Sequence, residues 1–286
     1  MRIGTNGLFS GFIGILIFSG SLPATRLAVL GFPPLFLTSA RAVIAAALAA
    51  ALLALAPQKR PDPADLISLV VIASGVVVGF PLLTALALTH VTSAHSVVFI
   101  GLLPLATAGF AVLRGHERPK PLFWLFSGLG SLVVAGFALS QSGGGSVAGD
   151  LLMLAAILVC GLGYAEGGKL ARRLGGWQVI SWALLLASPI MLTIGLATLP
   201  ATWPPLADRA WAGLAYVSIF SMLVGFIFWY RGLALGGAAG VGQLQLLQPF
   251  FGLALAALVL GEAVSPVMIG SAVLVIGCVV LARRFA

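Results

Sequence analysis

A small set of polar and aromatic side chains stands out in this sequence because the rest of it is so apolar. Inside a membrane a polar side chain that faces lipid is costly, so it usually faces other helices or a path for a solute. Residues of this kind are therefore the first candidates for solute binding. We select His95, Tyr164, Gln243, Gln245 and Gln248, with Phe80, Phe99 and Trp182 as candidate walls for apolar groups.

The three glutamines follow one another closely in a single apolar run. Gln245 and Gln248 are three residues apart and share a helix face, whereas Gln243 points elsewhere in a regular helix. Amides can hydrogen-bond a carboxylate or an ammonium group without carrying a charge, which allows release as well as binding. The alternative is that they bond to neighbouring helices and hold the bundle together.

His95, Glu166 and Arg41 each have two interpretations. The imidazole of His95 could bind a carboxylate or carry a proton, or it could bond to a nearby backbone carbonyl. Glu166 is the one carboxylate expected inside a span, and an ion pair with Lys169, one turn further on, is favoured over proton coupling. Arg41 lies about 10 Å below the outer end of its helix at 1.5 Å per residue, and it could snorkel or hold packed carbonyls, or attract an anionic group.

The composition indicates which elements must position these residues. Hydrophobic residues make up 60% of the 286 residues and charged residues 8%, against about 25% charged in a soluble domain. Mean hydropathy is +1.15. The sequence therefore predicts an all-α polytopic membrane protein in a lipid bilayer. Cys160 and Cys278 lie in apolar runs and predict neither a disulfide nor a metal site, and we expect no metal and no cofactor.

Ten apolar runs are long enough to cross a bilayer, which needs about 20 residues each. The predicted spans are Gly7–Leu22, Leu35–Ala56, Leu66–Thr89, Thr92–Leu113, Pro121–Ser140, Leu151–Gly168, Trp177–Leu199, Ala210–Tyr230, Ala238–Leu260 and Pro266–Ala282. None shows the alternation of about ten residues that is typical of a transmembrane barrel strand.

The basic residues orient these spans. With the N-terminus in the cytoplasm, twelve Lys and Arg fall inside and two, Arg26 and Arg209, fall outside. The twelve are Arg2, Lys59, Arg60, Arg114, Arg118, Lys120, Lys169, Arg172, Arg173, Arg231, Arg283 and Arg284. This asymmetry predicts an inner-membrane protein with both termini cytoplasmic. The net charge of +8 is scattered over short loops, so we expect no nucleic-acid partner.

An internal repeat divides the chain at its middle. A shift of 145 positions places Pro104 on Pro249, Glu117 on Glu262 and Pro121 on Pro266. We therefore predict two five-helix halves, residues 7–140 and 149–284, joined near Gly143–Gly145. Because five is odd, the second half must enter the membrane in the opposite orientation, as in many transporters with inverted repeats. Pro104 and Pro249 are the candidate hinges.

At these residues the chain resembles the EamA-type, ten-helix members of the drug/metabolite transporter superfamily. The resemblance lies in Ala85–Ala94 followed by Pro104 and His116–Pro119, and in Tyr230–Ala239 followed by Pro249 and Gly261–Glu262. Arg41 stands where the family commonly has an arginine in its second helix. The sequence departs from the family at Phe18–Gly20, where Trp-Gly is frequent.

This resemblance implies export of small metabolites across a bacterial inner membrane. Amino acids, including aromatic and apolar ones, are the expected cargo, and drug, nucleotide-sugar and sugar-phosphate carriers of the superfamily are the alternatives. Alternating access between the two inverted halves is the expected mechanism. A monomer is expected because ten helices can enclose a cavity alone.

Two other classes of protein are less compatible with the sequence. An intramembrane serine protease could use Ser74 with His95, but the flanking Gly-x-Ser-Gly pattern is absent. We therefore expect no enzymatic activity. A channel would not need the inverted repeat.

Overall fold

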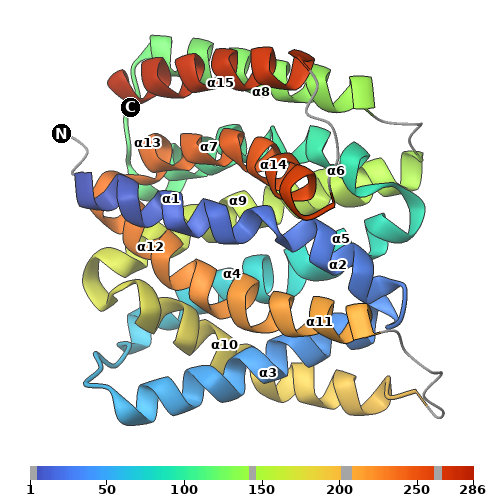
Figure 1. The fold of residues 1–286 in the computed structure, drawn as a ribbon. Helices are drawn as coiled ribbons and strands as arrows, with labels where there is room; N and C mark the ends of the chain where they lie inside the picture. Colours follow the sequence, from blue (N-terminus) through green and yellow to red (C-terminus); the bar gives the residue numbers. More distant parts are fainter. Residues whose placement is uncertain (1–4, 142–145, 201–207, 261–265) are drawn as a thin grey trace.

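The computed structural model describes residues 5–141, 146–200, 208–260 and 266–286, and within these ranges every regular element is a helix (Figure 1). The predicted all-α class is therefore confirmed. Glu262 and the predicted junction Gly143–Gly145 lie outside the described residues.

The helices follow the order of the predicted spans. Their bounds are α1 (Thr5–Ser19), α2 (Ser21–Val29), α3 (Pro34–Leu55), η1 (Pro63–Asp65), α4 (Leu66–Ile72), η2 (Ala73–Gly79), α5 (Phe80–His90), α6 (Ser93–Ile100), α7 (Leu103–Gly115), α8 (Pro121–Gln141), α9 (Val147–Leu174), α10 (Gly176–Ala197), α11 (Asp208–Tyr216), η3 (Val217–Val224), α12 (Gly225–Gly236), α13 (Ala238–Gly242), η4 (Gln243–Leu247), α14 (Gln248–Leu260) and α15 (Pro266–Arg284). Six of the described helical stretches are long and apolar enough to cross a membrane on their own.

Two helical stretches extend well beyond their predicted bounds, and in both cases charged residues in the extension have partners. The first stretch runs on through α2 to Val29 because Arg26 donates a hydrogen bond to the carbonyl of Leu88. The helix α9 continues past Gly168 to Leu174 because Arg172 and Arg173 pair with acidic residues of the first half. In both stretches the helix therefore continues past charged residues that have a hydrogen-bond or ionic partner on another element.

Each half packs its first span against the other half. The helix α9 of the second half contacts α5, η2 and α7 of the first, and α1 of the first half contacts α12 and α14 of the second. The equivalent helices α3 and α10 also contact each other, as do α8 and α15 (Figure 1). This reciprocal pattern is the one that two repeated, interlocked halves produce.

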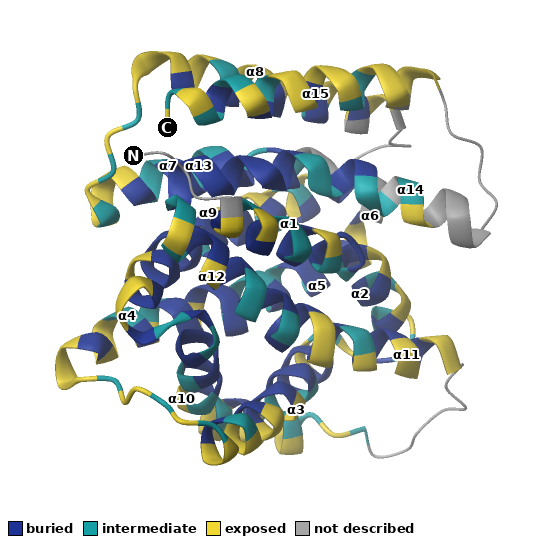
Figure 2. Ribbon diagram, turned by 60° about the vertical axis from the view of Figure 1, so that its left-hand side comes forward, coloured by how far each residue is buried: buried dark blue, intermediate teal, exposed yellow. Residues whose placement is uncertain are grey.

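The outer surface of the bundle is apolar, as contact with lipid requires. In Figure 2 the outer faces of α8 and α15 are largely exposed, whereas α9 and α12 are mostly buried. The exposed faces carry Leu125, Leu132, Val273 and Leu274. A soluble protein would cover or replace so large an apolar surface.

Both halves contain a π-helical stretch at the same position of the repeat. Ala73–Gly79 in η2 and Val217–Val224 in η3 begin 144 residues apart and end 145 apart, close to the sequence repeat of 145. π-helices are rare and often occur at functional sites. The repeat is therefore visible in the backbone as well as in the sequence.

The two candidate hinge prolines stand where their spans are interrupted. Pro104 is the second residue of α7, just after a turn at Gly101–Leu102, and Pro249 is the second residue of α14, just after the 3₁₀ segment η4. Proline cannot donate a hydrogen bond to the preceding turn, so a helix is interrupted or bent there. The prediction that these positions act as hinges still has to be tested by experiment.

The bundle has two distinguishable ends. The start of α1 and the end of α15 lie at the same end (Figure 1), close to the α7–α8 connection, since Gly7 contacts Gly236 and Lys120 donates a backbone hydrogen bond to Phe285. We call this the charged end, defined by Asp62, Asp65, Arg114, Glu117, Glu166, Lys169, Arg172 and Arg173. The other, defined by His90, His95 and Asp150, is called the opposite end.

Candidate functional site

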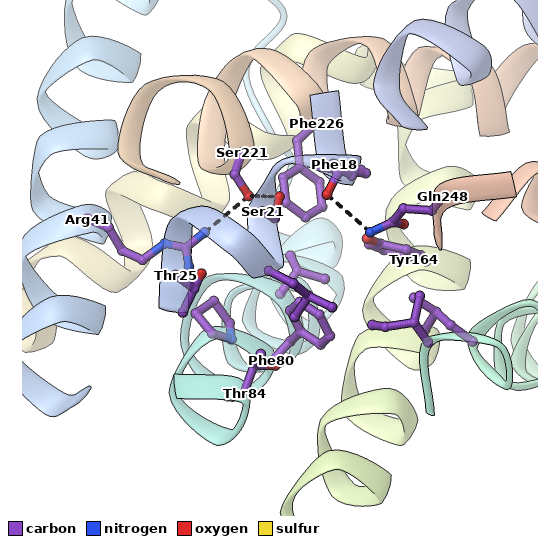
Figure 3. Close-up of a pocket in the computed structure, with 15 residues that line it drawn as sticks. Phe18, Ser21, Thr25, Arg41, Phe80, Thr84, Tyr164, Ser221, Phe226 and Gln248 are labelled. Carbon is purple, nitrogen blue, oxygen red and sulfur yellow. Dashed lines mark hydrogen bonds between the residues drawn. The ribbon is translucent and has the colours of Figure 1, made fainter. Parts of the chain in front are cut away.

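A cavity lies between the two halves in the middle of the bundle (Figure 3). The room that it offers to a water-sized molecule is only about 30 Å³, well below the roughly 300–1,000 Å³ of a typical ligand pocket. The lining residues are Phe18, Ser21, Leu22, Thr25, Arg41, Val76, Phe80, Pro81, Thr84, Ile100, Leu103, Tyr164, Ser221, Phe226 and Gln248. The cavity must widen before it can hold a solute larger than water.

The cavity lies where equivalent parts of the two repeats meet. Three pairs of lining residues are 145 positions apart: Val76 with Ser221, Pro81 with Phe226, and Leu103 with Gln248. Val76 belongs to the π-helical η2 and Ser221 to the π-helical η3. The two irregular segments therefore both border the cavity, which is the location expected of a site that changes shape when the halves move.

The polar groups of the cavity are concentrated on two sides. On one side Arg41 donates from Nη2 to the hydroxyl oxygen of Ser221 at 3.2 Å, and Ser21 donates to the same oxygen at 2.8 Å (Figure 3). On the other side Gln248 donates from Nε2 to the carbonyl of Phe18 at 3.1 Å, near Tyr164. The rings of Phe18 and Phe226 lie between the two sides (Figure 3).

An aromatic cluster separates the cavity from the charged end. The ring of Tyr164 lies 5.4 Å from Trp229 and 5.9 Å from Phe226, and Phe226 lies 5.3 Å from Tyr230, between centroids. Trp229 and Tyr230 are fully buried, one turn beyond Phe226 along α12 toward the charged end. The Tyr230 hydroxyl donates to the carbonyl of Gly163 at 3.2 Å and so ties α12 to α9. This packing closes the route from the cavity to the charged end.

Glu166 is the centre of the first polar group beyond the aromatic cluster. Its carboxylate is 1% exposed, accepts a hydrogen bond from Ser68 at 2.6 Å and pairs with Arg114 at 3.1 Å. The predicted pair with Lys169 is present at 3.9 Å. Ser68 and Arg114 belong to the first half and Glu166 to the second, so this buried group links the halves.

Glu117 links the halves at the same end. Its two carboxylate oxygens accept hydrogen bonds from the backbone amides of Ala238 and Ala239 at 2.9 and 2.8 Å, and one of them pairs with Arg172 at 2.8 Å. Gly237 adopts a φ of 82°, where a side chain would be strained, and this turn brings the two amides to Glu117. A carboxylate at the positive end of a helix is favourable.

Arg173 adds a third link between the halves, to Asp62 at 2.8 Å and to Asp65. At the opposite end, among the residues described, one ion pair crosses between the halves, from His95 Nε2 to Asp150 Oδ1 at 2.7 Å. The two ends are therefore held together very differently.

The predicted binding residues are divided between the cavity and other places. Tyr164, Phe80 and Gln248 line the cavity, whereas the described lining does not include the other five. His95 lies at the opposite end beside Phe99, with ring centroids 6.0 Å apart, and Trp182 donates to the carbonyl of Lys59 at 3.3 Å. Gln243 and Gln245 are buried in η4, where Gln245 donates to the carbonyl of Gly242 at 3.1 Å.

Several small hydroxyl residues of the cavity are absent from the candidates predicted from the sequence. Ser21, Thr25, Thr84 and Ser221 line it, and the Thr84 hydroxyl has no partner in the described structure. Serine and threonine are common in membrane helices, where they usually bond to their own backbone, so their types alone gave no signal. The repeat could have indicated Ser221, because it is the polar counterpart of Val76.

A multi-pass helical bundle built from two repeats, with a small cavity of mixed apolar and polar lining between them, is typical of a membrane transport protein. The chain belongs to the EamA-like transporter family, whose sequence profile matches it twice, over residues 5–139 and 147–284. A relative from Bacillus subtilis (strain 168), "Uncharacterized transporter YdeK", is 65% identical over 282 residues, 99% of this chain and 98% of its own length. A solved structure titled "Crystal structure of protein" superposes on this chain with a TM-score of 0.76 at 22% sequence identity. The match covers 98% of this chain and 99% of the other, and it supports the fold.

Proposed function

We propose that this protein exports amino acids across the bacterial inner membrane by alternating access, with the central cavity as its one cargo site. The observation that carries the proposal is that repeat-related residues of both halves line the same cavity. When the halves exchange conformations, a site at their common boundary can face first one side of the membrane and then the other. The amino-acid cargo and the outward direction rest on the resemblance to EamA-type exporters.

The side chains of the cavity support an amino acid as cargo. Arg41 and Gln248 offer polar contacts on opposite sides, and Phe80, Tyr164 and Phe226 offer apolar surface. We propose cargo contact for Gln248, Tyr164 and Phe80. For His95, Gln243, Gln245, Phe99 and Trp182 we propose a role in holding the helices together.

The proposed orientation places the charged end in the cytoplasm and the protein in the membrane as a monomer. The basic residues gather at this end, in agreement with the positive-inside rule. In this orientation the closed route faces the cytoplasm. Protease accessibility of a tag on the C-terminus in inside-out and right-side-out vesicles tests the orientation.

Counterflow in liposomes tests the proposed function. Purified protein is reconstituted with a high internal concentration of one unlabelled amino acid, and entry of the labelled amino acid is followed. A saturable, competable flux supports a carrier, and the absence of such flux for all twenty amino acids contradicts the proposal. Gln248→Ala should raise the KM of the flux about tenfold, whereas Gln58→Ala, which changes an amide outside the cavity, should leave it unchanged.

A further inference from the structure

Arg41 is a buried cation that faces the cavity without a carboxylate partner. It is 6% exposed, its Nη2 reaches the hydroxyl of Ser221, and its Nε has no partner among the described residues. No carboxylate of the described residues lies within 4.0 Å of it, although every other buried charged group named above has an ionic partner. A hydroxyl compensates only part of the cost of burying a charge.

The wall of the cavity is electrostatically one-sided. Arg41 is the one charged residue among the lining residues described, and no acidic side chain occurs among them. The equivalent helix of the second half, α10, contains no charged residue at all, so the repeat does not supply a balancing group. The cavity therefore attracts negative charge on the side where Ser21, Thr25 and Ser221 also lie (Figure 3).

We propose that Arg41 forms an anion subsite that binds the carboxylate of the cargo and so restricts transport to solutes with a free acidic group. This inference rests on the proposed function, since it assigns a part of the same cavity. The guanidinium donates through Nε and Nη2, the two donors of a fork that matches a carboxylate. The hydroxyl of Ser221, another lining residue of the cavity, accepts a hydrogen bond from Nη2 and so holds one side of the fork in place.

The rest of the cavity defines the other end of such a solute. Gln248 and Tyr164 lie across the cavity from Arg41 (Figure 3), so an ammonium or hydroxyl group there can bond to the amide oxygen. Phe18, Phe80 and Phe226 provide apolar surface. The preferred ligands are thus zwitterions or monoanions with an apolar body, and cations that lack an acid are excluded.

Competition on the wild-type protein is the first test and needs no variant. The amino acid with the largest counterflow serves as reporter, and three unlabelled derivatives of it compete: the acid without its amino group, the amide, and the amine without its carboxylate. The acid should compete within about threefold of the parent, and the amide and the amine at least tenfold more weakly. Equal competition by the amine overturns the anion subsite while the carrier function stands.

Variants of Arg41 separate binding from folding. Arg41→Gln should raise the KM at least tenfold and abolish the preference for the acid over the amide, and Arg41→Lys should retain that preference in part. Ser221→Ala should weaken the preference less than Arg41→Gln. Arg209→Gln removes a charge from an exposed position outside the cavity and should change neither quantity. An unchanged preference in Arg41→Gln contradicts the proposal.

Anion-dependent stabilisation keeps the two proposals distinguishable. If no amino acid gives counterflow, the proposed function fails. The melting temperatures of the wild type and of Arg41→Gln in detergent are then measured with acetate, phosphate or chloride. Stabilisation of the wild type alone by acetate supports the subsite, and stabilisation by chloride or phosphate but not acetate replaces it with a site for inorganic anions only. Equal response of the two proteins overturns it.

Discussion

The charged end and the opposite end of the bundle are joined by contacts of different kind. At the charged end, Glu166 and Glu117 each link the halves through several charged or backbone partners, with Arg173 as a further link. At the opposite end, within the described residues, His95 and Asp150 form one ion pair. The difference indicates that this conformation is closed mainly at its charged end.

Burial decides how much each link contributes. At the charged end the buried partner is the carboxylate of Glu166, 1% exposed, whereas at the opposite end the carboxylate of Asp150 is 38% exposed and the buried partner is the imidazole of His95, 8% exposed. A buried charge that loses its partner costs about 3–5 kcal/mol, whereas an exposed pair contributes about 0.2–1 kcal/mol. The two ends should therefore respond very unequally to the loss of one charge, and four substitutions test this, from the largest expected effect to the smallest.

Arg114→Ala should destabilise the protein most, because it leaves the buried carboxylate of Glu166 with Ser68 and the more distant Lys169. We expect a loss of about 3 kcal/mol in the free energy of unfolding, measured by SDS titration in mixed micelles. Arg118→Ala, an exposed arginine of the same connection, is the matched control and should change it by less than about 0.5 kcal/mol. Equal effects of the two would mean that Glu166 does not hold this end.

Glu117→Gln should loosen the charged end without unfolding it. The side-chain oxygen of the glutamine can still accept a hydrogen bond from the backbone amide of Ala238 or Ala239. The negative charge of Glu117 is removed, so its attraction to the positive helix end and to Arg172 is lost. We expect the equilibrium between the two conformations to shift by about 1–2 kcal/mol toward the one that is open at this end. A cysteine placed at Ala234 should then react roughly tenfold faster with an impermeant maleimide. Cys160 and Cys278 are replaced first, and an unchanged rate would contradict the role of Glu117.

Asp150→Asn should have a smaller effect, confined to the opposite end. The pair with His95 loses its charge, yet the asparagine oxygen can still accept a hydrogen bond. We expect a change of less than about 1 kcal/mol in unfolding free energy and no faster labelling at Ala234. An effect as large as that of Arg114→Ala would show that the two ends are held equally strongly.

Asp62→Asn should have the smallest effect. The side chains of Asp62 and Arg173 are 69% and 47% exposed, so water screens their attraction. The asparagine also keeps the capping interaction at the start of η1. The expected change is below about 0.5 kcal/mol in the same SDS titration, and a larger loss would place this exposed pair among the main links.

The order and approximate bounds of the spans could be predicted because hydropathy depends on local composition. The backbone interruptions in η2 and η3 could not, since Ala73–Gly79 and Val217–Val224 are as apolar as an ordinary helix. The pair of Glu166 with Lys169 was predicted from its spacing, whereas Ser68 and Arg114 come from the other half and require the tertiary fold.

The lining of the central cavity was only partly predictable for the same reason. Gln248 and Tyr164 were selected by residue type, and both line it. Gln245 and His95 had equally suggestive types, but their bonds to Gly242 and Asp150 are set by neighbouring backbone and by a residue of the other half. Arg41 was weighed between two roles, and its position beside Ser221 depends on how α3 packs against η3.

The matching π-helical segments bear on how the protein arose. An α-helix acquires a π-helical stretch when its chain gains a residue that the regular hydrogen bonding cannot absorb, and two independent gains would rarely fall at one register. The stretches at Ala73–Gly79 and Val217–Val224 share that register within the repeat of 145 residues. Duplication of one five-helix unit that already carried the extra residue would produce this shared register.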